Sequence, residues 1–468
     1  MTGADFLQLD PAGAPPRGLA SWLAAEIRAA VADGRLPIDA RLPATRALAG
    51  ELAVSRGVVV EAYQRLVDEG VLAGHRGGGT VVRAGLTQPV PAAPTRPNAP
   101  VELDLSPGVP DLSAFPRAAW LRAERTVLER ISPRDLRYGD PRGVFALRTA
   151  VAGWLSRNRG IRADPDDLLI VNGVAQTLSL LARVLPARGK PAIGVEEPGS
   201  FGSRSLFVYH GLRTVPIPVD EQGIDVDALV ESNVDSVLTT PAHQMPTGVV
   251  LAAPRRRALL DWAAAGGLLI EDDYDAEHRY DRAPVGALHA LAPDRIVYTG
   301  SVSKILAPAL RMGWLLAPPE LRADLVEAKY CTDISSPSLG QFTLAEMITN
   351  GAVEKHLRLT RGRHRRRRNA VLDALAEYFP GARVHGVAAG LHLLVSLPDL
   401  ADDADLAERA LAEGVAVHPL SWYRSNPGDP GLVIGYAATP PDQLREAIRR
   451  LSEVHTSSRA TRAGTRFG

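Results

Sequence analysis

The apolar residues in the first eighty positions recur at helical spacing in three successive stretches. The first stretch ends near Gly34, and the third follows Ser55 and closes at Gly70. Residues 71–82 then form two short apolar runs around a glycine-rich tip, which predicts a β-hairpin. The apolar positions of the three stretches are Trp22, Leu23, Ile27, Val31, Leu48, Leu52, Val54, Val59, Tyr63, Leu66 and Val67. Three short helices and a hairpin predict a winged helix-turn-helix, whose third helix would enter the DNA major groove.

The pattern changes after this unit. Residues 84–103 are rich in Pro and Ala and lack an apolar period, so we expect an extended linker there. From residue 104, short apolar runs alternate with helical stretches such as 176–184 and 254–265, which predicts a parallel α/β sheet. The expected strands are 168–171, 192–195, 215–218, 237–240, 268–271, 296–299 and 313–316. Functional groups collect at the carboxyl ends of such strands, where this chain has Gly173, Glu196, Pro241, Asp272 and Ser301.

Composition narrows the class of protein. A chain of 468 residues with 46% hydrophobic and 23% charged residues is folded and has two or three domains. Its one cysteine, Cys331, excludes an internal disulfide framework and a cysteine-based zinc site, so we expect a reducing, cytoplasmic setting and no metal. The chain starts without a secretion signal and has no long apolar run, so we expect no membrane segment. The net charge is zero, so contacts to nucleic acid must come from locally placed arginines.

Lys304 is one of only four lysines among 53 basic residues. A lysine can lose its proton in a dry pocket and form an imine with an aldehyde, whereas an arginine cannot. Lys304 follows the run Gly300-Ser301-Val302-Ser303, and Arg311 lies seven residues later. Taken alone, this lysine could equally be a surface residue after a strand.

The segment 42–82 resembles the DNA-binding domain of GntR-family regulators, and the resemblance covers residues 17 to 83. It implies DNA contacts at Arg46, Ser55, Arg56 and Gly57, and at Arg76 and Gly77 in the wing tip. Hydroxyl and backbone N–H groups at a helix N-terminus suit phosphate, and an arginine there can reach a guanine edge. Val60 stands where some relatives have another arginine, so the base preference does not transfer. The alternative is that these arginines only solvate a small helical domain.

The segment 270–275 resembles the aspartate-then-tyrosine segment of fold-type I aminotransferases, which bind pyridoxal 5′-phosphate. The resemblance implies that Lys304 forms a Schiff base, the internal aldimine, with this cofactor. Asp272, 32 residues before Lys304, would keep the pyridine nitrogen protonated, and Tyr274 would bond the phenolic oxygen. The alternatives for this acidic run are a solvated loop or a metal site.

The phosphate of the cofactor needs oriented donors. The segment 172–177 lies between a strand and a helix, so its backbone N–H groups can face an anion. The expected phosphate-binding residues are Gly173, Val174, Ala175, Gln176, Ser301, Ser303 and Arg311. Tyr138 resembles the aminotransferase tyrosine that reaches the phosphate of the neighbouring subunit, which implies a homodimer. The turn Pro107-Gly108 resembles one that lies near the substrate, although a plain turn is an equal interpretation.

Three positions depart from the aminotransferase pattern. Met245 replaces the usual asparagine before Pro-Thr-Gly, so His243 or Gln244 would have to substitute for it or serve only in packing. Val433 replaces the arginine that clamps a substrate carboxylate. Phe201, expected to stack on the cofactor ring, lies one place later than the usual aromatic residue.

Both halves together resemble the MocR/GabR-type subfamily of GntR regulators, over residues 17 to about 455. The expected fold class is an N-terminal winged helix-turn-helix (α+β) plus an α/β fold-type I aminotransferase-like domain at 104–455. That domain includes a smaller C-terminal α+β subdomain at about 351–455, and a disordered tail at 456–468 follows. The arginine-rich run 361–368 is interpreted as a solvated helix face.

The resemblance implies a pyridoxal phosphate-dependent transcription regulator that binds a double-stranded DNA operator and senses the cofactor, or a small-molecule amine or amino-acid effector. Whether it is an enzyme stays open: one alternative is an active aminotransferase with an accessory DNA-binding domain. Another is a regulator that has lost the cofactor, which the complete set of Asp272, Tyr274, Lys304 and Arg311 disfavours.

Overall fold

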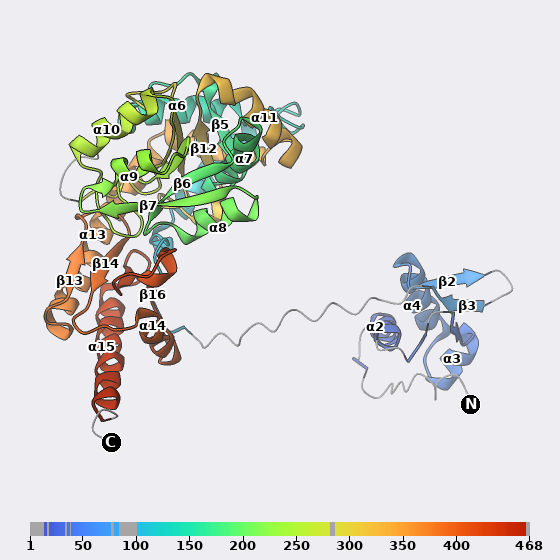
Figure 1. Ribbon diagram of the computed structural model, residues 1–468. Helices are drawn as coiled ribbons and strands as arrows, with labels where there is room; N and C mark the ends of the chain where they lie inside the picture. Colours follow the sequence, from blue (N-terminus) through green and yellow to red (C-terminus); the bar gives the residue numbers. More distant parts are fainter. Residues whose placement is uncertain are drawn as a thin grey trace. The chain divides into compact units, whose positions relative to one another are not determined.

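The computed structural model describes residues 14–15, 18–32, 35–37, 39–75, 79–83, 101–280 and 286–464. The chain divides into two compact units, Met1–Asn98 and Ala99–Gly468, which are considered separately (Figure 1). Most of the expected linker lies outside the described residues. Its last residues belong to the second unit, because the backbone N–H groups of Glu102 and Leu103 donate to Gly414 O.

The first unit has the three expected helices, α2 (Leu19–Ala32), α3 (Thr45–Glu51) and α4 (Arg56–Asp68). The hairpin strands β2 (Leu72–His75) and β3 (Gly79–Val82) follow, and a short strand that the apolar pattern did not predict, β1 (Arg41–Leu42), pairs with β3. The core contains Leu23, Ile27, Leu36, Leu48, Val59, Tyr63, Leu66 and Val82. The Tyr63 hydroxyl donates to Pro43 O at 3.0 Å, which ties α4 to the segment that leads into α3. This unit is the winged helix-turn-helix that the periodicity predicts.

Among the described residues of the second unit, an eight-stranded sheet has the order β5-β12-β11-β10-β9-β6-β7-β8. The strands are β5 (Leu169–Val171), β6 (Ala192–Glu197), β7 (Arg213–Asp220), β8 (Gly223–Ile224), β9 (Ser236–Thr239), β10 (Leu268–Asp272), β11 (Ile296–Ser301) and β12 (Gly313–Leu316). All seven expected strands are present. The sheet is mixed rather than parallel, because β12 runs antiparallel to both β11 and β5, and β8 runs antiparallel to β7. The expectation of a parallel sheet is therefore wrong at β12. A parallel return needs a crossover of about a dozen residues or more, and the link from Ser301 to Gly313 holds no α-helix.

Alternate strand residues face opposite helical layers. Leu169, Val171 and Ile270 pack with α7 (Val174–Ala187), α8 (Phe201–Tyr209) and α11 (Pro319–Asp333). On the other face, Ile170 and Trp314 pack with α6 (Phe145–Arg159) and α12 (Ser338–Thr349), while Leu269 packs with α9 (Val226–Glu231) and α10 (Ala253–Ala264). Both faces of the sheet are thus buried, which explains why its central strands are nearly all apolar. Helix α5 (Arg117–Arg130) packs on α12.

The long helix α13 (Ala352–Tyr378) leads into the smaller subdomain, whose antiparallel sheet has the order β13-β14-β17-β16 (Figure 1). These strands are β13 (Arg383–His385), β14 (His392–Ser396), β16 (His418–Pro419) and β17 (Leu432–Gly435), with α14 (Asp403–Ala412) and α15 (Pro441–Gly464) beside them. Strand β4 (Leu103–Asp104) joins the subdomain by pairing with β15 (Val415–Ala416). The expected boundary at residue 351 stays a prediction: α13 begins at Ala352, and its first turns pack in the core beside the large sheet through Val353 and Leu357.

The structure corrects two further expectations, one for the arginine-rich run 361–368 and one for the tail 456–468. The arginine-rich run is only partly a solvated face: Arg365 and Arg366 are exposed, whereas Arg363 and Arg367 form ion pairs with Asp111 at 3.1 Å. The expected disordered tail is wrong for residues 456–464, because α15 continues to Gly464. A polar helix face needs no apolar period, and the Thr456 hydroxyl donates back to Ser452 O. Within the described ranges, no helix is long and apolar enough to cross a membrane.

Candidate functional site

A cavity of about 820 Å³ is lined by side chains from the carboxyl-terminal edge of the large sheet. Strands β9, β10 and β11 bring residues there from their carboxyl ends, and the antiparallel β12 brings Arg311 from its amino end. The subdomain supplies the opposite wall. Of the residues expected from sequence, the cavity is lined by Val174, Ala175, Phe201, Asp272, Tyr274, Ser301, Ser303, Lys304 and Arg311.

The amine of Lys304 is held inside this cavity. Burial lowers the pKa of Lys304, and the nearby Asp275 and Asp272 carboxylates oppose that shift. The Nζ atom donates to Gly108 O, in the Pro107-Gly108 turn. A Cβ on Gly108 would lie 3.1 Å from this Nζ, so the turn needs glycine for its close approach to the lysine. The turn expected near the substrate therefore contacts the proposed nucleophile.

Each carboxylate of the acidic run 271–275 has its own environment. Glu271 accepts the backbone N–H groups of Leu288 and His289 at 2.9 Å. Asp273 forms a buried ion pair with Arg159. Only the Asp272 side chain lines the cavity, and its buried Oδ1 has no hydrogen-bond partner within the described part of the chain.

This environment determines the protonation of Asp272. Burial and the neighbouring Asp273 carboxylate raise the pKa of Asp272 to about 7, while the Lys304 charge lowers it. A buried polar atom without a partner costs about 1–3 kcal/mol. A cationic N–H donor from a bound molecule would remove that cost. The acidic run is therefore neither a solvated loop nor a cluster of metal ligands, because its members point to different partners.

Residues expected to bind the phosphate lie around Gly173. This residue precedes α7 with φ 79°, and a Cβ there would lie 2.9 Å from Nη2 of Arg311. The Arg311 Nη2 donates to Asn172 O at 2.8 Å. Ser301 and Ser303 line the cavity beside them. Glycine is needed here both for its positive φ and for the approach of the guanidinium.

Three expected cofactor residues, Gly173, Gln176 and Tyr138, do not line the cavity. The backbone N–H of Gln176 donates to Gly173 O, and its side chain bonds Asn172 N and Asp333. The backbone N–H of Gln176 is thus engaged within the chain, and its expected direct contact with the phosphate stays a prediction. Tyr138 is 87% exposed and lines a separate hollow of about 850 Å³, so it does not reach the cavity of its own chain.

Two of the three departures from the aminotransferase pattern, Met245 and Val433, belong to one apolar cluster. Val433 is fully buried and clusters with Leu394, Leu420 and Tyr423, and Met245 packs against this cluster. Gln244 does not line the cavity: its amide donates to Glu196, Pro198 O and Met245 O. The wall that would hold a carboxylate clamp is thus apolar.

An aromatic group on the subdomain side was missed by the sequence reasoning. His418, Trp422 and Tyr423 line the cavity, and Phe201 lines it from α8. His418 Nδ1 lies 2.8 Å from the Tyr423 hydroxyl, and the His418 and Trp422 ring centroids are 5.0 Å apart. No short motif marks these residues, because a distant part of the chain folds them against the strand ends.

The described residues of the first unit that are expected to contact DNA are exposed. Arg46 on α3 is exposed, as are Ser55, Arg56 and Gly57 at the start of α4. Ser55 occupies the N-cap position without forming a side-chain capping bond, so its hydroxyl is available to another acceptor or donor. Val60 follows on the same helix and is 45% exposed. The expected wing-tip residues, Arg76 and Gly77, lie outside the described residues.

Each of the two units matches a known protein family. Residues 19–82 match the family described as bacterial regulatory proteins, gntR family, and residues 101–451 match aminotransferase class I and II. The pyridoxine biosynthesis transcriptional regulator PdxR of Corynebacterium glutamicum is 34% identical, over 94% of this chain and 96% of its own. The probable rhizopine catabolism regulatory protein MocR of Rhizobium meliloti is 30% identical over 91% of both chains.

Solved structures resemble the second unit. The kynurenine aminotransferase of Pyrococcus horikoshii matches with a TM-score of 0.70 and 29% identity, over 76% of this chain and 91% of that one. Membership of one protein family therefore accounts for the strand order, the cavity and the winged helix-turn-helix. The chain belongs to the MocR-type branch of the GntR family of transcription regulators, in which a winged helix-turn-helix is fused to an aminotransferase domain.

Proposed function

We propose that this regulator holds pyridoxal 5′-phosphate covalently at Lys304, and that occupancy of the cavity controls how a homodimer binds its DNA operator. The observation that carries the proposal is the pairing of two groups in one cavity. Lys304 presents an amine whose pKa burial has lowered, and Asp272 presents a buried oxygen without a partner in the described structure. An amine for an aldehyde and an acceptor for a pyridinium N–H are the two groups that this cofactor requires.

The residues present fit the cofactor in other respects. Tyr274 keeps its proton, because burial and the Asp275 charge raise its pKa well above the usual value, so it can donate to a phenolic oxygen. Arg311, Ser301 and Ser303 would bind the phosphate together with the amino end of α7. Phe201 would pack beside the ring. When bound, the cofactor supplies an aldehyde that reacts with primary amines.

The effector class follows from charge. Among the described residues that line the cavity, the cationic side chains are Lys304 and Arg311, and both are committed to the cofactor. Burial lowers the pKa of His392 to about 3 and also lowers that of His418, so neither ring carries charge near neutral pH. An α-carboxylate would find no counter-charge beside Val433. The favoured signals are therefore the cofactor itself or an amine without an α-carboxylate.

Two further points support this assignment. The similar protein from Corynebacterium glutamicum is named as a regulator of pyridoxine biosynthesis, which suits a signal of the vitamin B6 type. The exposed Tyr138 lies outside its own cavity, as expected of a residue that completes the site of a second subunit. Two DNA-reading heads in such a dimer would need half-sites about 34 Å apart, or a multiple of this distance.

The test is covalent trapping. Adding pyridoxal 5′-phosphate should produce the visible absorbance band of a lysine-bound cofactor, and borohydride should fix one cofactor to the peptide that contains Lys304. Lys304→Ala should lose both signals, whereas Lys355→Ala, which changes an exposed lysine, should keep them. A band that survives in Lys304→Ala would overturn the assignment.

The complete set of cofactor groups also supports the rival function, an aminotransferase with an accessory DNA-binding unit. Steady transfer of an amino group from an amino acid to a keto acid would favour that function. The apolar wall at Val433 opposes it, because substrate orientation by a bidentate arginine is lost.

A further inference from the structure

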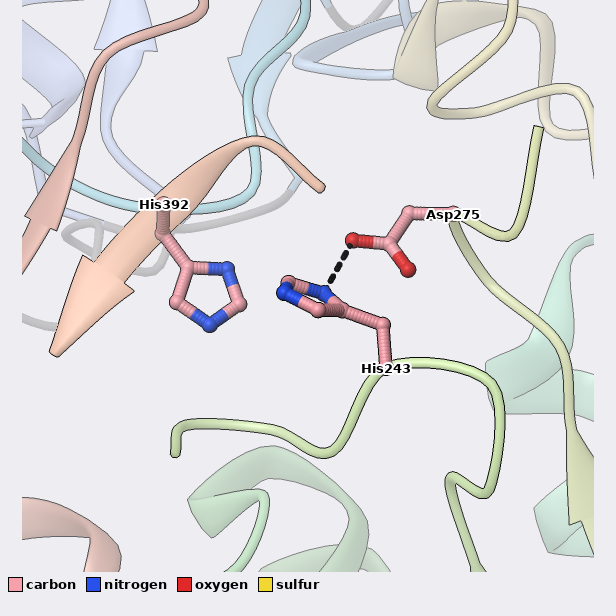
Figure 2. A group of neighbouring side chains, drawn as sticks. All are labelled: His243, Asp275 and His392. Atoms are coloured by element: carbon pink, nitrogen blue, oxygen red, sulfur yellow. Dashed lines mark hydrogen bonds and ion pairs between the residues drawn. The ribbon is translucent and has the colours of Figure 1, made fainter. Parts of the chain in front are cut away.

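Behind Tyr274 lies a buried group of three side chains that the cofactor site does not use. Figure 2 shows His243 between Asp275 and His392. His243 comes from the loop after β9, Asp275 from the segment after β10, and His392 from the start of β14. All three are at most 5% exposed, and His243 and Asp275 do not line the cavity.

The hydrogen-bond donors in this group can be assigned. His243 Nδ1 lies 2.9 Å from Asp275 Oδ2 and 3.1 Å from the Tyr274 hydroxyl. A carboxylate only accepts hydrogen bonds, so Nδ1 must carry a hydrogen that it donates to Asp275. The same nitrogen then has no lone pair to accept the Tyr274 proton. The phenolic oxygen can at most share the Nδ1 hydrogen, and its own proton stays free for another acceptor.

Asp275 is the competitor for that proton. Besides His243, the ionisable groups that act on Tyr274 are Asp275, Asp272 and Glu196. Of the three carboxylates, Asp275 has the largest effect, because it raises the pKa of Tyr274 both by its charge and as a hydrogen-bond acceptor for the hydroxyl. His243 occupies Asp275 Oδ2 and therefore limits the capture of the Tyr274 proton by this carboxylate. Without His243, the hydroxyl could turn into Asp275 and away from the cavity.

The pair has little freedom to rearrange. A Cβ on Gly390 would lie 2.1 Å from His243 Cε1 and 2.7 Å from Asp275 Oδ2, so the Gly390 backbone packs directly against both side chains. His392 lies on the other side, with its ring centroid 5.0 Å from that of His243. Its Nε2 must donate to Pro246 O at 3.2 Å, because a carbonyl only accepts. A neutral ring and a glycine backbone therefore hold the imidazole in place.

A metal ion would be another use for two histidines and a carboxylate. Their ligand atoms lie within 4.8 Å of one another. The Nδ1 to Oδ2 distance is that of a direct hydrogen bond, however, and His392 Nε2 is engaged with a carbonyl. With Gly390 packed against the pair, hydrogen bonding accounts for the group better than an ion does.

We infer that His243 is a positioning residue that, by engaging the competing carboxylate of Asp275, keeps the Tyr274 hydroxyl proton directed into the cavity. His243 thus acts through the tyrosine, in a segment where Met245 replaces the usual asparagine donor. This inference rests on the proposed function, because its consequence appears on the phenolic oxygen of the cofactor bound at Lys304.

The test is a pH titration of the visible band of the full-length, cofactor-loaded protein. Tyr274→Phe removes a donor to the phenolic oxygen and should raise the titration midpoint by about one pH unit. His243→Ala should raise it in the same direction, and adding it to Tyr274→Phe should produce no further shift. His243→Asn, whose amide can donate from nearly the position of Nδ1, should restore most of the wild-type midpoint.

A second variant separates this role from packing. Asp275→Asn weakens the competing acceptor, so His243→Ala combined with Asp275→Asn should titrate closer to the wild type than His243→Ala alone. A general packing defect would instead grow worse in the double variant. Thermal unfolding identifies variants that do not fold. If His243→Ala does not fold, the isosteric variants His243→Asn and Asp275→Asn are compared with the wild type instead, and both should titrate near the wild-type midpoint.

The outcomes are distinguishable. If the wild type forms no Lys304-linked band, the proposed function fails. If the band forms but His243→Ala titrates like the wild type, or its shift adds fully to that of Tyr274→Phe, only the inference is overturned. Metal analysis that found one ion per chain, lost in His243→Ala, would also overturn it.

Discussion

The two sides of the cavity are built differently. On the strand-end side, Asp272, Lys304 and Arg311 present ionisable groups in places suited to a pyridine nitrogen, an aldehyde and a phosphate. On the subdomain side, the corresponding wall is aromatic and apolar, with Trp422 exposed to the cavity and Val433 buried behind Tyr423. An enzyme that exchanges amino acids needs both the cofactor groups and a carboxylate clamp. Here the residues proposed to hold the cofactor are present without such a clamp, which favours the proposed sensing role over turnover.

The largest effect should come from the charged side. Asp272→Ala removes the acceptor for a protonated ring nitrogen, a pair worth on the order of 4 kcal/mol before desolvation at an effective dielectric of about 20. We expect the affinity for pyridoxal 5′-phosphate to fall by about 100- to 1,000-fold. Equilibrium titration of the visible band measures this, with Asp261→Ala on α10 as a matched change of an exposed carboxylate. A loss of less than about fivefold would show that Asp272 does not face the ring nitrogen.

The phosphate cradle should contribute somewhat less. Arg311→Ala removes a charge-assisted contact worth about 1.5–3 kcal/mol, so affinity for the phosphorylated cofactor should fall by about 10- to 100-fold. Gly173→Ala should act in the same direction, because its Cβ would lie 2.9 Å from the Arg311 guanidinium. Pyridoxal without the phosphate is the control ligand, and its binding should hardly change. An equal loss for both ligands would place Arg311 elsewhere in the site.

The apolar wall leads to a prediction with a smaller effect, which concerns the choice between an amine and an amino acid. An amine and the amino acid with the same side chain differ only in the carboxylate, for which this wall offers no partner. We expect the amine to perturb the cofactor band at a concentration about tenfold lower than the amino acid. Titration of the band with such matched pairs measures the ratio. Tighter binding of the amino acid would reveal a clamp that the lining residues do not suggest.

The smallest effect is a pH-dependent change in the free energy of unfolding. Burial raises the pKa of Asp272 from its ordinary value to about 7, so its protonated form is favoured in the folded protein. Its contribution to the free energy of unfolding is therefore fully present below about pH 4 and is lost as the pH rises through about 7. Without cofactor, Asp272→Asn should be as stable as the wild type at pH 4 and more stable at pH 8, by a few kcal/mol at most.

Thermal unfolding of the cofactor-free proteins at both pH values checks this sign. Stability that is unchanged at pH 8 would mean that the carboxyl is better solvated than its burial implies.

Sequence reasoning predicted the local features well. Apolar periodicity identified the three helices of the first unit and seven strands of the second, because these patterns reflect burial within each element. The strand-end rule then placed Asp272 and Ser301 at the same edge of the sheet without any knowledge of distances. The antiparallel direction of β12 could also have been predicted from the sequence, since the short link from Ser301 to Gly313 excludes a helical crossover.

The features that sequence reasoning missed depend on tertiary contacts. Gln176 lies in the expected phosphate loop, but Asp333, 157 residues away, engages its amide. Trp422 and Tyr423 reach the cavity only because the subdomain folds back on the sheet. His243 meets Asp275 from a different strand end, so the acidic run alone could not reveal the partner of Asp275. The tail after Val454 lacks an apolar period and still forms helix.

The central claim is that the cavity around Lys304 controls DNA binding. The direct measurement is the affinity of the full-length protein for an operator selected in vitro from random DNA, at one fixed salt concentration, with and without pyridoxal 5′-phosphate. The account predicts that the cofactor changes the affinity or the protected footprint of the wild type and of Lys355→Ala, and leaves Lys304→Ala unchanged. An identical response in Lys304→Ala, or no response in the wild type, would contradict it.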